Sequence, residues 1–250
     1  MYQFFVEPEQ IDVAGKSVII RGADVNHIKN VLRMRPGEEV AVSNGIDGRE
    51  YRCGILALEE DCVRLELRFI KEDGVELPAK IYLFQGLPKA DKMEWIIQKT
   101  VELGVTRIVP VMTKRTVVKL DAKKAGKKTE RYQAIALAAA KQSGRGVIPE
   151  VTAPVTWKEA LAMAKELDMN MIPYEEAEGV EYSKEVFASI KGKKSLGIFI
   201  GPEGGFAGEE VEAATDMGAK MVTLGHRILR TETAGMAVMS IIMFELEEDR

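Results

Sequence analysis

The pattern of hydrophobic and polar residues in this 250-residue chain changes near residue 75. Before that point, short segments alternate apolar and charged side chains, as strands with one buried face do. The clearest, residues 63–69, places three aliphatic side chains and Phe69 on one face. Turn signals at Asn44-Gly45 and Asp47-Gly48 lie between two further predicted strands, at 40–42 and 51–55. The first part of the chain is therefore predicted to be rich in β-structure.

One helix is predicted among these strands, at residues 24–34. It buries Ile28, Val31 and Leu32 and stops before Pro36. Residues 71–78 are polar, with a glycine and a proline near the ends of the segment. We therefore place the domain boundary there, between a domain of residues 1–73 and a domain of residues 74–250.

After the boundary, predicted strands alternate with predicted helices. The strands are at 81–84, 107–111, 170–174, 196–200 and 220–224, and the helices at 91–103, 129–143, 156–167, 209–217 and 233–247. This alternation indicates the α/β class, with a parallel sheet covered on both faces. Because apolar groups surround most of the last helix, it must be buried in the core or against a second subunit.

Two loops near the C-terminus, residues 201–206 and 224–234, each follow a short apolar strand and precede a helix. The first of these strands, 196–200, has no polar side chain, which is typical of a strand buried on both faces. Loops at the carboxyl ends of parallel strands bind ligands in open α/β sheets. The alternative reading of the glycine-rich first loop is a tight turn between a strand and a helix.

The charges of the first loop bear on the kind of ligand. Glu203, Glu209 and Glu210 crowd the start of the following helix, and neither Gly-x-Gly-x-x-Gly nor the Walker pattern occurs. Such a helix start does not suit a phosphate. A neutral or cationic ligand fits better.

The composition indicates a globular chain, with 46% hydrophobic and 30% charged residues and a net charge of -4. No apolar stretch is long enough to span a membrane, and the N-terminus does not resemble a signal peptide. Two cysteines and two histidines are scattered singly, which predicts neither a disulfide nor a metal site. We therefore expect reduced thiols, a cytoplasmic location and no membrane partner.

Positive charge is concentrated in residues 114–145. This segment holds ten basic and two acidic residues, a local balance of +8, whereas residues 1–73 hold 10 basic and 14 acidic residues. A run of charge is often only a solvated surface, but a bias of one sign also suits a polyanion such as RNA.

Several runs, taken together and in this order, resemble one known family. They are His27-Ile28 with Val31-Leu32-Arg33, Gln85-Gly86-Leu87-Pro88-Lys89, Lys92-Met93-Glu94, Glu102-Leu103-Gly104, Lys114-Arg115-Thr116-Val117-Val118, Gln142-Ser143-Gly144-Arg145 and the two loops described above. The chain resembles the RsmE-type small-subunit ribosomal RNA uridine-N3 methyltransferases of the SPOUT class. The resemblance covers nearly the whole chain.

The resemblance implies a PUA-like β-barrel at 1–73 and a SPOUT domain with a trefoil knot at 74–250. It also implies a homodimer that uses S-adenosylmethionine to methylate N3 of one uridine in 16S ribosomal RNA of the small subunit. Two alternatives stay open: a SPOUT enzyme that methylates another RNA position, such as a ribose 2′-oxygen, and a non-catalytic RNA-binding assembly factor.

The resemblance also implies which residues bind the cofactor, and the chemistry of the reaction and the distribution of charge add candidates for catalysis and RNA binding. The predicted cofactor-binding residues are Pro173, Tyr174, Gly201, Pro202, Glu203, Gly204, Gly205, Leu224, Gly225, Ile228, Leu229 and Ala234. The predicted catalytic residues are Arg230, to hold a uracil carbonyl oxygen, and Glu232, to position or accept the imide proton. Alternatively, these two side chains pair only to fix their loop. The predicted RNA-binding residues are Arg33, Lys89, Arg115, Lys123, Lys124, Lys127, Lys128 and Arg145.

Overall fold

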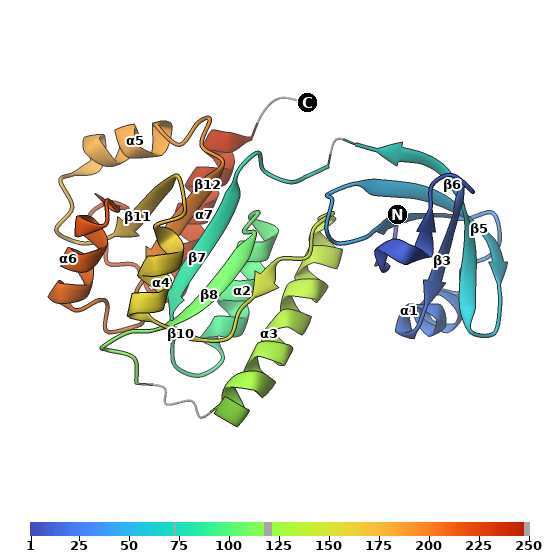
Figure 1. The fold of residues 1–250 in the computed structure, drawn as a ribbon, viewed down its shortest axis with the longest axis horizontal. Helices are drawn as coiled ribbons and strands as arrows, with labels where there is room; N and C mark the ends of the chain where they lie inside the picture. Colours follow the sequence, from blue (N-terminus) through green and yellow to red (C-terminus); the bar gives the residue numbers. More distant parts are fainter. Residues whose placement is uncertain (73, 118–121, 248–250) are drawn as a thin grey trace. The chain divides into compact units, whose positions relative to one another are not determined.

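The computed structural model describes residues 1–72, 74–117 and 122–247, without the side chains of residues 122–124. The chain forms two compact units (Figure 1). The first comprises Met1–Glu76 together with Ala140–Ile148, and the second comprises Leu77–Ala139 and Pro149–Arg250. The break near residue 76 lies close to the predicted boundary, whereas the return of 140–148 to the first unit was not predicted.

The first unit is built on a curled sheet of six strands, in the order β1-β4-β5-β6-β3-β2. Their bounds are β1 Gln3–Phe5, β2 Ile11–Asp12, β3 Ser17–Arg21, β4 Glu39–Ser43, β5 Glu50–Leu58 and β6 Cys62–Lys71, with a 3-10 turn, η1, at Pro8–Gln10. The pairs are antiparallel except β1 with β4. Side chains from one face of these strands form the core of the unit.

The predicted alternation along β6 is correct only as far as Leu67. Val63, Leu65 and Leu67 are buried, but the Phe69 side chain is 58% exposed. The register explains the difference, because Cys53 pairs with Leu67 while the preceding residue of β5 pairs with Phe69. Residue 68 is therefore an extra residue on β6, a β-bulge, and it moves the following side chains to the opposite face.

The predicted helix at 24–34 is shorter and less regular than expected. It consists of α1 (Ala23–Asn26) and a π-helical turn, η2 (His27–Val31), in which the N–H of Leu32 bonds to the carbonyl of His27 at 2.9 Å. The wider turn rotates the later residues around the axis. Ile28 stays buried as predicted, but Val31 is 61% exposed, so its predicted burial is wrong.

The second unit contains a parallel sheet in the order β10-β8-β7-β12-β11-β13, with β9 paired to β8. The bounds are β7 Lys80–Gly86, β8 Arg107–Met112, β9 Glu150–Val151, β10 Val155–Thr156, β11 Met169–Pro173, β12 Ser195–Ile200 and β13 Lys220–Val222. All five strands predicted here are present. Residues 196–200 of β12 are buried, as the absence of polar side chains predicted.

Helices cover the two faces of this sheet (Figure 1). The bounds are α2 Lys92–Glu102, α3 Ala122–Ser143, α4 Trp157–Ala164, α5 Val180–Ala188, α6 Gly208–Asp216 and α7 Thr231–Leu246. One cluster combines α4 and α6 with the sheet, while α7 packs against α2, α5 and β12. Helix α5 was not predicted, because its nine residues carry only a short apolar stripe.

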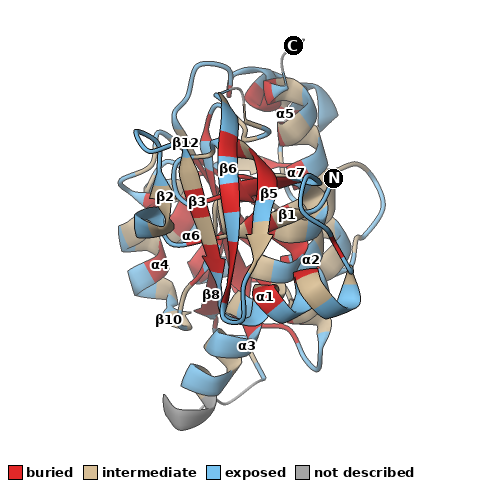
Figure 2. Cartoon of the chain, turned by 90° about the vertical axis from the view of Figure 1, so that its right-hand side faces the viewer, coloured by how far each residue is buried: buried red, intermediate tan, exposed pale blue. Residues whose placement is uncertain are grey.

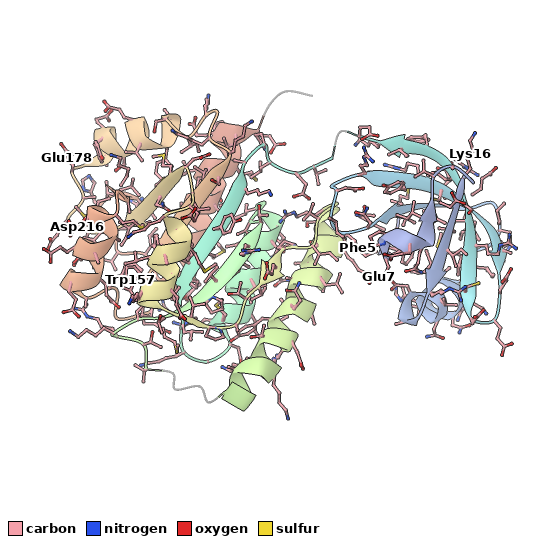
Figure 3. The ribbon with its side chains drawn as sticks, viewed as in Figure 1. Phe5, Glu7, Lys16, Trp157, Glu178 and Asp216 are labelled. Atoms are coloured by element: carbon pink, nitrogen blue, oxygen red, sulfur yellow. The ribbon has the colours of Figure 1, made fainter. Side chains whose placement is uncertain are left out.

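Aromatic side chains pack against one another on the sheet where β7 and β12 are neighbours. The rings of Phe84 and Phe199 stack with centroids 4.6 Å apart, and Trp157 packs against Phe199 at 5.2 Å and Phe206 at 5.1 Å. Trp157 lies at the start of α4 (Figure 3), and buried residues concentrate on the strands (Figure 2). Since Phe206 directly follows the loop 201–205, this aromatic group supports that loop.

The last helix is only partly buried within the chain. Val238, Met239 and Ile242 are buried, whereas Phe244 is 79% exposed. Among the described helices, none has the length and apolar character needed to cross a membrane.

A buried ion pair joins 140–148 to the rest of the first unit. The Arg145 side chain is 4% exposed, and its Nη2 lies 2.5 Å from a carboxylate oxygen of Glu76. The same carboxylate accepts the N–H groups of Gly146 at 3.1 Å and Val147 at 3.2 Å. One acidic side chain therefore orients the whole turn after α3.

We expect Arg145→Ala to lower the free energy of unfolding by on the order of 3 kcal/mol, because it leaves a partly buried carboxylate without its cation. Arg21→Ala is the control, since the pair of Arg21 with Asp61 has side chains 56% and 76% exposed. Its loss should cost less than about 1 kcal/mol. Urea denaturation of the two variants measures the difference, and equal losses would contradict this account.

Candidate functional site

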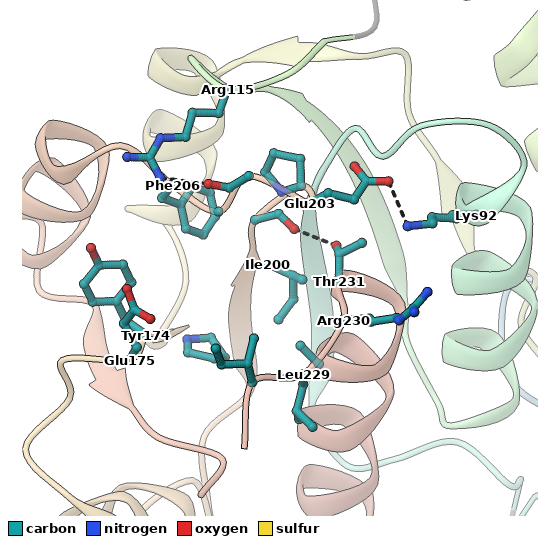
Figure 4. Close-up of a pocket in the computed structure, with 17 residues that line it drawn as sticks. Lys92, Arg115, Tyr174, Glu175, Ile200, Glu203, Phe206, Leu229, Arg230 and Thr231 are labelled. Carbon is teal, nitrogen blue, oxygen red and sulfur yellow. Dashed lines mark hydrogen bonds and ion pairs between the residues drawn. The ribbon is translucent and has the colours of Figure 1, made fainter. Parts of the chain in front are cut away.

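Four loops meet at the carboxyl ends of the adjacent parallel strands β7, β12, β11 and β13. Two cavities open there, of about 550 Å³ and 560 Å³. They share six lining residues, which are Pro173, Tyr174, Glu175, Ile228, Leu229 and Ala234. The cavities are therefore two lobes of one cleft, with a combined size suited to a small-molecule ligand. Figure 4 shows the first lobe.

Close backbone packing shapes the first lobe. An added Cβ at Gly86 would lie 2.5 Å from Cδ and 2.7 Å from the nitrogen of Pro202, and one at Gly201 would lie 3.0 Å from Cα of Gly205. Gly205 has φ +68°, and its N–H bonds to the carbonyl of Pro202 at 2.8 Å. These glycines thus make a tight turn that also borders a cavity, so the two readings of the loop are compatible.

A buried chain of hydrogen bonds connects three segments of the site. Gln85, at the end of β7, donates from Nε2 to the Thr231 hydroxyl at 2.9 Å. That hydroxyl donates to the carbonyl of Gly201 at 2.6 Å. Gln85 and Thr231 are both buried. The first turn of α7 is therefore held against the loop that follows β12.

The acidic residues around 203–210 are not a free negative surface. Glu203 accepts the backbone N–H of Lys89 at 3.1 Å, and Glu209 pairs with Lys114 at 2.6 Å. Glu210 is buried and accepts the N–H groups of Lys114 and Ala207, both at 2.8 Å. The protein's own donors occupy these carboxylates, so they disfavour a phosphate at this helix start but offer little unpaired negative charge to a cationic ligand.

Lys92, on the first turn of α2, connects two carboxylates beside the cleft. Its Nζ lies 2.9 Å from Glu203 (Figure 4) and 3.6 Å from Glu232. The hydrogen bond to Glu203 raises the pKa of Lys92 above 10.5. Burial alone raises the pKa of Glu203, but hydrogen bonds from Lys92 and backbone N–H groups outweigh it and hold that pKa below 4.5. The Lys92–Glu203 contact is therefore fully formed between pH 4.5 and pH 10.5. It is lost when the pH falls below the lowered pKa of Glu203 or rises above the raised pKa of Lys92.

All of the predicted cofactor-binding residues line the cleft. Leu224 and Gly225 line the second lobe, and the other ten line the first. Arg230 also lines the first lobe, but Glu232 does not. Glu232 pairs with Lys92, and the described residues show no ion pair between Arg230 and Glu232, which does not support the alternative of an Arg230–Glu232 pair. One carboxylate oxygen of Glu232 is buried and has no hydrogen-bond partner in the described part of the chain.

The predicted RNA-binding residues have different environments. Arg33, Lys89 and Lys127 are exposed, and Lys128 is half-buried. Arg115 lines the first lobe and donates to the carbonyl of Gly204 at 2.8 Å. Arg145 contacts RNA only if its ion pair opens. Lys123 and Lys124 have side chains outside the described residues.

Sequence reasoning did not assign Lys92, Glu175 or Thr231 to the site. Lys92 belongs to a motif that was recognised, but its helix starts far from both loops in sequence. Glu175 directly follows a predicted pair, Pro173-Tyr174, at the end of a predicted strand. The position of Glu175 after that strand was a usable signal, and so was the place of Thr231 within the predicted loop 224–234, whereas Lys92 required the tertiary structure.

Comparisons with known proteins agree with this architecture. A family model described as an RNA methyltransferase domain matches residues 75–243, and one described as an RNA methyltransferase PUA domain matches residues 20–67. The class is thus that of RNA methyltransferases with a PUA domain and a mixed α/β domain.

Full-length relatives are more specific. The ribosomal RNA small subunit methyltransferase E of Bacillus subtilis is 38% identical over 99% of this chain and 98% of its own length. The protein of the same name from Aquifex aeolicus is 32% identical over 97% and 99%. The crystal structure of the Neisseria gonorrhoeae protein of this name, bound to S-adenosyl methionine, has a TM-score of 0.82 and 33% identity over 98% and 97%. This chain belongs to the RsmE-type family of RNA methyltransferases.

We expect Gly86→Ala to displace the Gly201-Pro202 turn and to lower the free energy of unfolding by about 1–3 kcal/mol, because the added methyl group meets backbone atoms. Gly208→Ala is the matched control, since an added Cβ there meets nothing within 4 Å. The change in Trp157 fluorescence on urea denaturation reports both variants. Equal stability of Gly86→Ala and wild type would show that the turn adapts.

Proposed function

We propose that this protein transfers a methyl group from S-adenosylmethionine to N3 of a uridine in the 16S ribosomal RNA of the small subunit. The observation that carries the proposal is the two-lobed cleft, lined by Gly201–Gly205 and Leu229 and bordered on one side by Lys92 and Arg230. Membership of the RNA methyltransferase family supports the reaction class. The N3 position rests on the resemblance and on the chemistry below.

The cleft fits the cofactor in size and in surface. Glycines and apolar side chains line much of it. The cofactor supplies an electrophilic methyl group on a sulfonium. Glu175 is the carboxylate that lines both lobes, and it has no ion pair among the described residues. We place the sulfonium near Glu175, since the carboxylates around 203–210 are already engaged.

The acceptor must present the imide edge of its uracil, so a splayed-out or single-stranded uridine is required. When the N3 proton leaves, negative charge spreads over the two flanking carbonyl oxygens. Arg230 lines the cavity and has no ion pair among the described residues, so its guanidinium is available to donate to one oxygen. The Glu232 carboxylate, which has an oxygen without a donor, accepts the proton across one water.

The remaining features of the proposal concern assembly. The exposed apolar surface of α7, with Phe244 79% exposed, supports a homodimer in which a second copy covers this helix. Exposed Arg33, Lys89 and Lys127 and half-buried Lys128 are proposed to contact RNA phosphates, which predicts affinity that falls with salt. The trefoil knot and the cytoplasmic location are proposed from the resemblance.

The decisive experiment incubates small ribosomal subunits that lack the modification with the protein and labelled S-adenosylmethionine. Mass spectrometry of the digested RNA should find labelled 3-methyluridine at one site. A labelled 2′-O-methyl nucleoside would indicate another acceptor, and RNA binding without transfer would indicate an assembly factor.

Arg230→Ala should reduce kcat by about 10²–10³-fold.

We expect Glu175→Gln to weaken binding of S-adenosylmethionine by about threefold to tenfold and to weaken that of S-adenosylhomocysteine less, because the product lacks the sulfonium charge. Glu176→Gln is the matched control, as this neighbouring exposed carboxylate does not line the cleft. Calorimetric titration gives the affinities. Equal losses for both ligands would place the sulfonium away from Glu175.

A further inference from the structure

The position of Lys92 leads beyond the proposed roles of Arg230 and Glu232. Lys92 lines the first lobe, whereas Glu232 lies behind it and does not. Figure 4 shows Lys92 and Arg230 on the same side of the cavity, across from Tyr174 and Glu175. Both cations therefore line the same lobe from one side. The hydrogen bond to Glu203 is the main cause of the raised pKa of Lys92, and the charge of Arg230 acts against it.

The hydrogen bonding of Lys92 is incomplete. An ammonium has three donors, and one of them is used at 2.9 Å by Glu203. The distance of 3.6 Å to Glu232 Oε2 is an ion pair without a hydrogen bond, and that oxygen has no other partner in the described part of the chain. The side chain of Lys92 is 32% exposed, so a donor remains available on the cavity side.

A deprotonated uracil has two negatively charged oxygens, and each of them can accept a hydrogen bond from one cation. Removing the N3 proton of uracil leaves negative charge on both O2 and O4, one on each side of N3. A single guanidinium contacts one of these oxygens. We propose that Lys92 is a second catalytic cation, which donates to one uracil carbonyl oxygen while Arg230 donates to the other. This inference rests on the proposed uridine-N3 reaction.

The charges balance through the step. Lys92 and Arg230 carry +2, and Glu203 and Glu232 carry -2, so the cluster is neutral before the reaction. The N3 proton passes to Glu232, the N3 lone pair forms the bond to the methyl carbon, and the carbon–sulfur bond breaks with its electrons on sulfur. The cluster and the ring keep their total charge while the proton moves. Protonation of Glu232 removes its attraction for Lys92, and the hydrogen bond to Glu203 still holds the ammonium in place.

Lys92 also contacts the proposed cofactor loop, because its partner Glu203 belongs to residues 201–206. The effect of replacing Lys92 on that loop must therefore be separated from its effect on the acceptor. Glu203 keeps the N–H of Lys89 as a donor if Lys92 is replaced, and the Gln85–Thr231–Gly201 hydrogen bonds hold the loop independently. Replacement of Lys92 should therefore affect the acceptor reaction more than cofactor binding.

The test compares Lys92→Met, Lys92→Arg and the control Lys99→Met, which removes a lysine of the same helix that pairs with Glu102. Lys92→Met should lower kcat by about 10²–10³-fold with the dissociation constant of S-adenosylmethionine changed less than about threefold. Lys92→Arg should recover a large part of kcat, and Lys99→Met should match wild type.

A substrate with a more acidic imide separates a catalytic from a structural role. Subunits assembled on RNA transcribed with 5-fluorouridine carry an N3–H that ionises more readily. Lys92→Met should lose less activity on this substrate than on ordinary subunits. Binding of ordinary and of fluorinated ribosomal subunits in the presence of S-adenosylhomocysteine gives a readout without turnover. Wild type should prefer the fluorinated subunits increasingly as the pH rises, and Lys92→Met should show a smaller preference.

Equal losses of kcat on both substrates, or a loss of cofactor affinity that accounts for the whole defect, would overturn the role of Lys92. The proposed function fails separately, if wild type forms no 3-methyluridine. If wild type forms 3-methyluridine and Lys92→Met does so at the normal rate, only this inference is wrong.

Discussion

The chain of hydrogen bonds from Gln85 through Thr231 to the carbonyl of Gly201 is the interaction on which the cleft depends. It joins the end of β7 to the start of α7, 146 residues later in the sequence, and the start of α7 to the loop after β12, 30 residues earlier. Because these groups are buried, loss of one partner leaves the others without the compensation of water. The neighbouring contact of Gly86 with Pro202 requires the same close approach. Polar and steric constraints thus hold the loop 201–205 and the first turn of α7 together.

The side of the cleft that carries Lys92 follows from this arrangement. Once the first turn of α7 is fixed, Glu232 comes within reach of Lys92, and Glu203 of the neighbouring loop pairs with the same ammonium. The same region therefore contains the glycine-rich loop 201–205 and a compact set of opposite charges. Such sites suit reactions in which charge moves without a change in total charge, because preorganised groups need little rearrangement.

The argument for a cationic ligand shows how far local charge reasoning reaches. Three acidic residues crowd the start of α6, as the sequence indicates, and this disfavours a phosphate there. Their charge is nevertheless paired within the protein, because Glu210 accepts backbone N–H groups, Glu203 pairs with Lys92 of α2 and Glu209 pairs with Lys114. Net charge in sequence does not report which carboxylates remain unpaired.

The sequence by itself determined the class of fold, the five principal strands of the parallel sheet and the two loops that line the cleft. Buried strands and glycine-rich turns are local patterns, so they can be read along the chain. Only the tertiary structure decided that Phe69 faces solvent after a bulge, that Arg145 is buried against Glu76, and that Lys92 stands between Glu203 and Glu232. These are contacts between distant segments, and their geometry depends on strand register and helix packing, which no single window of sequence contains.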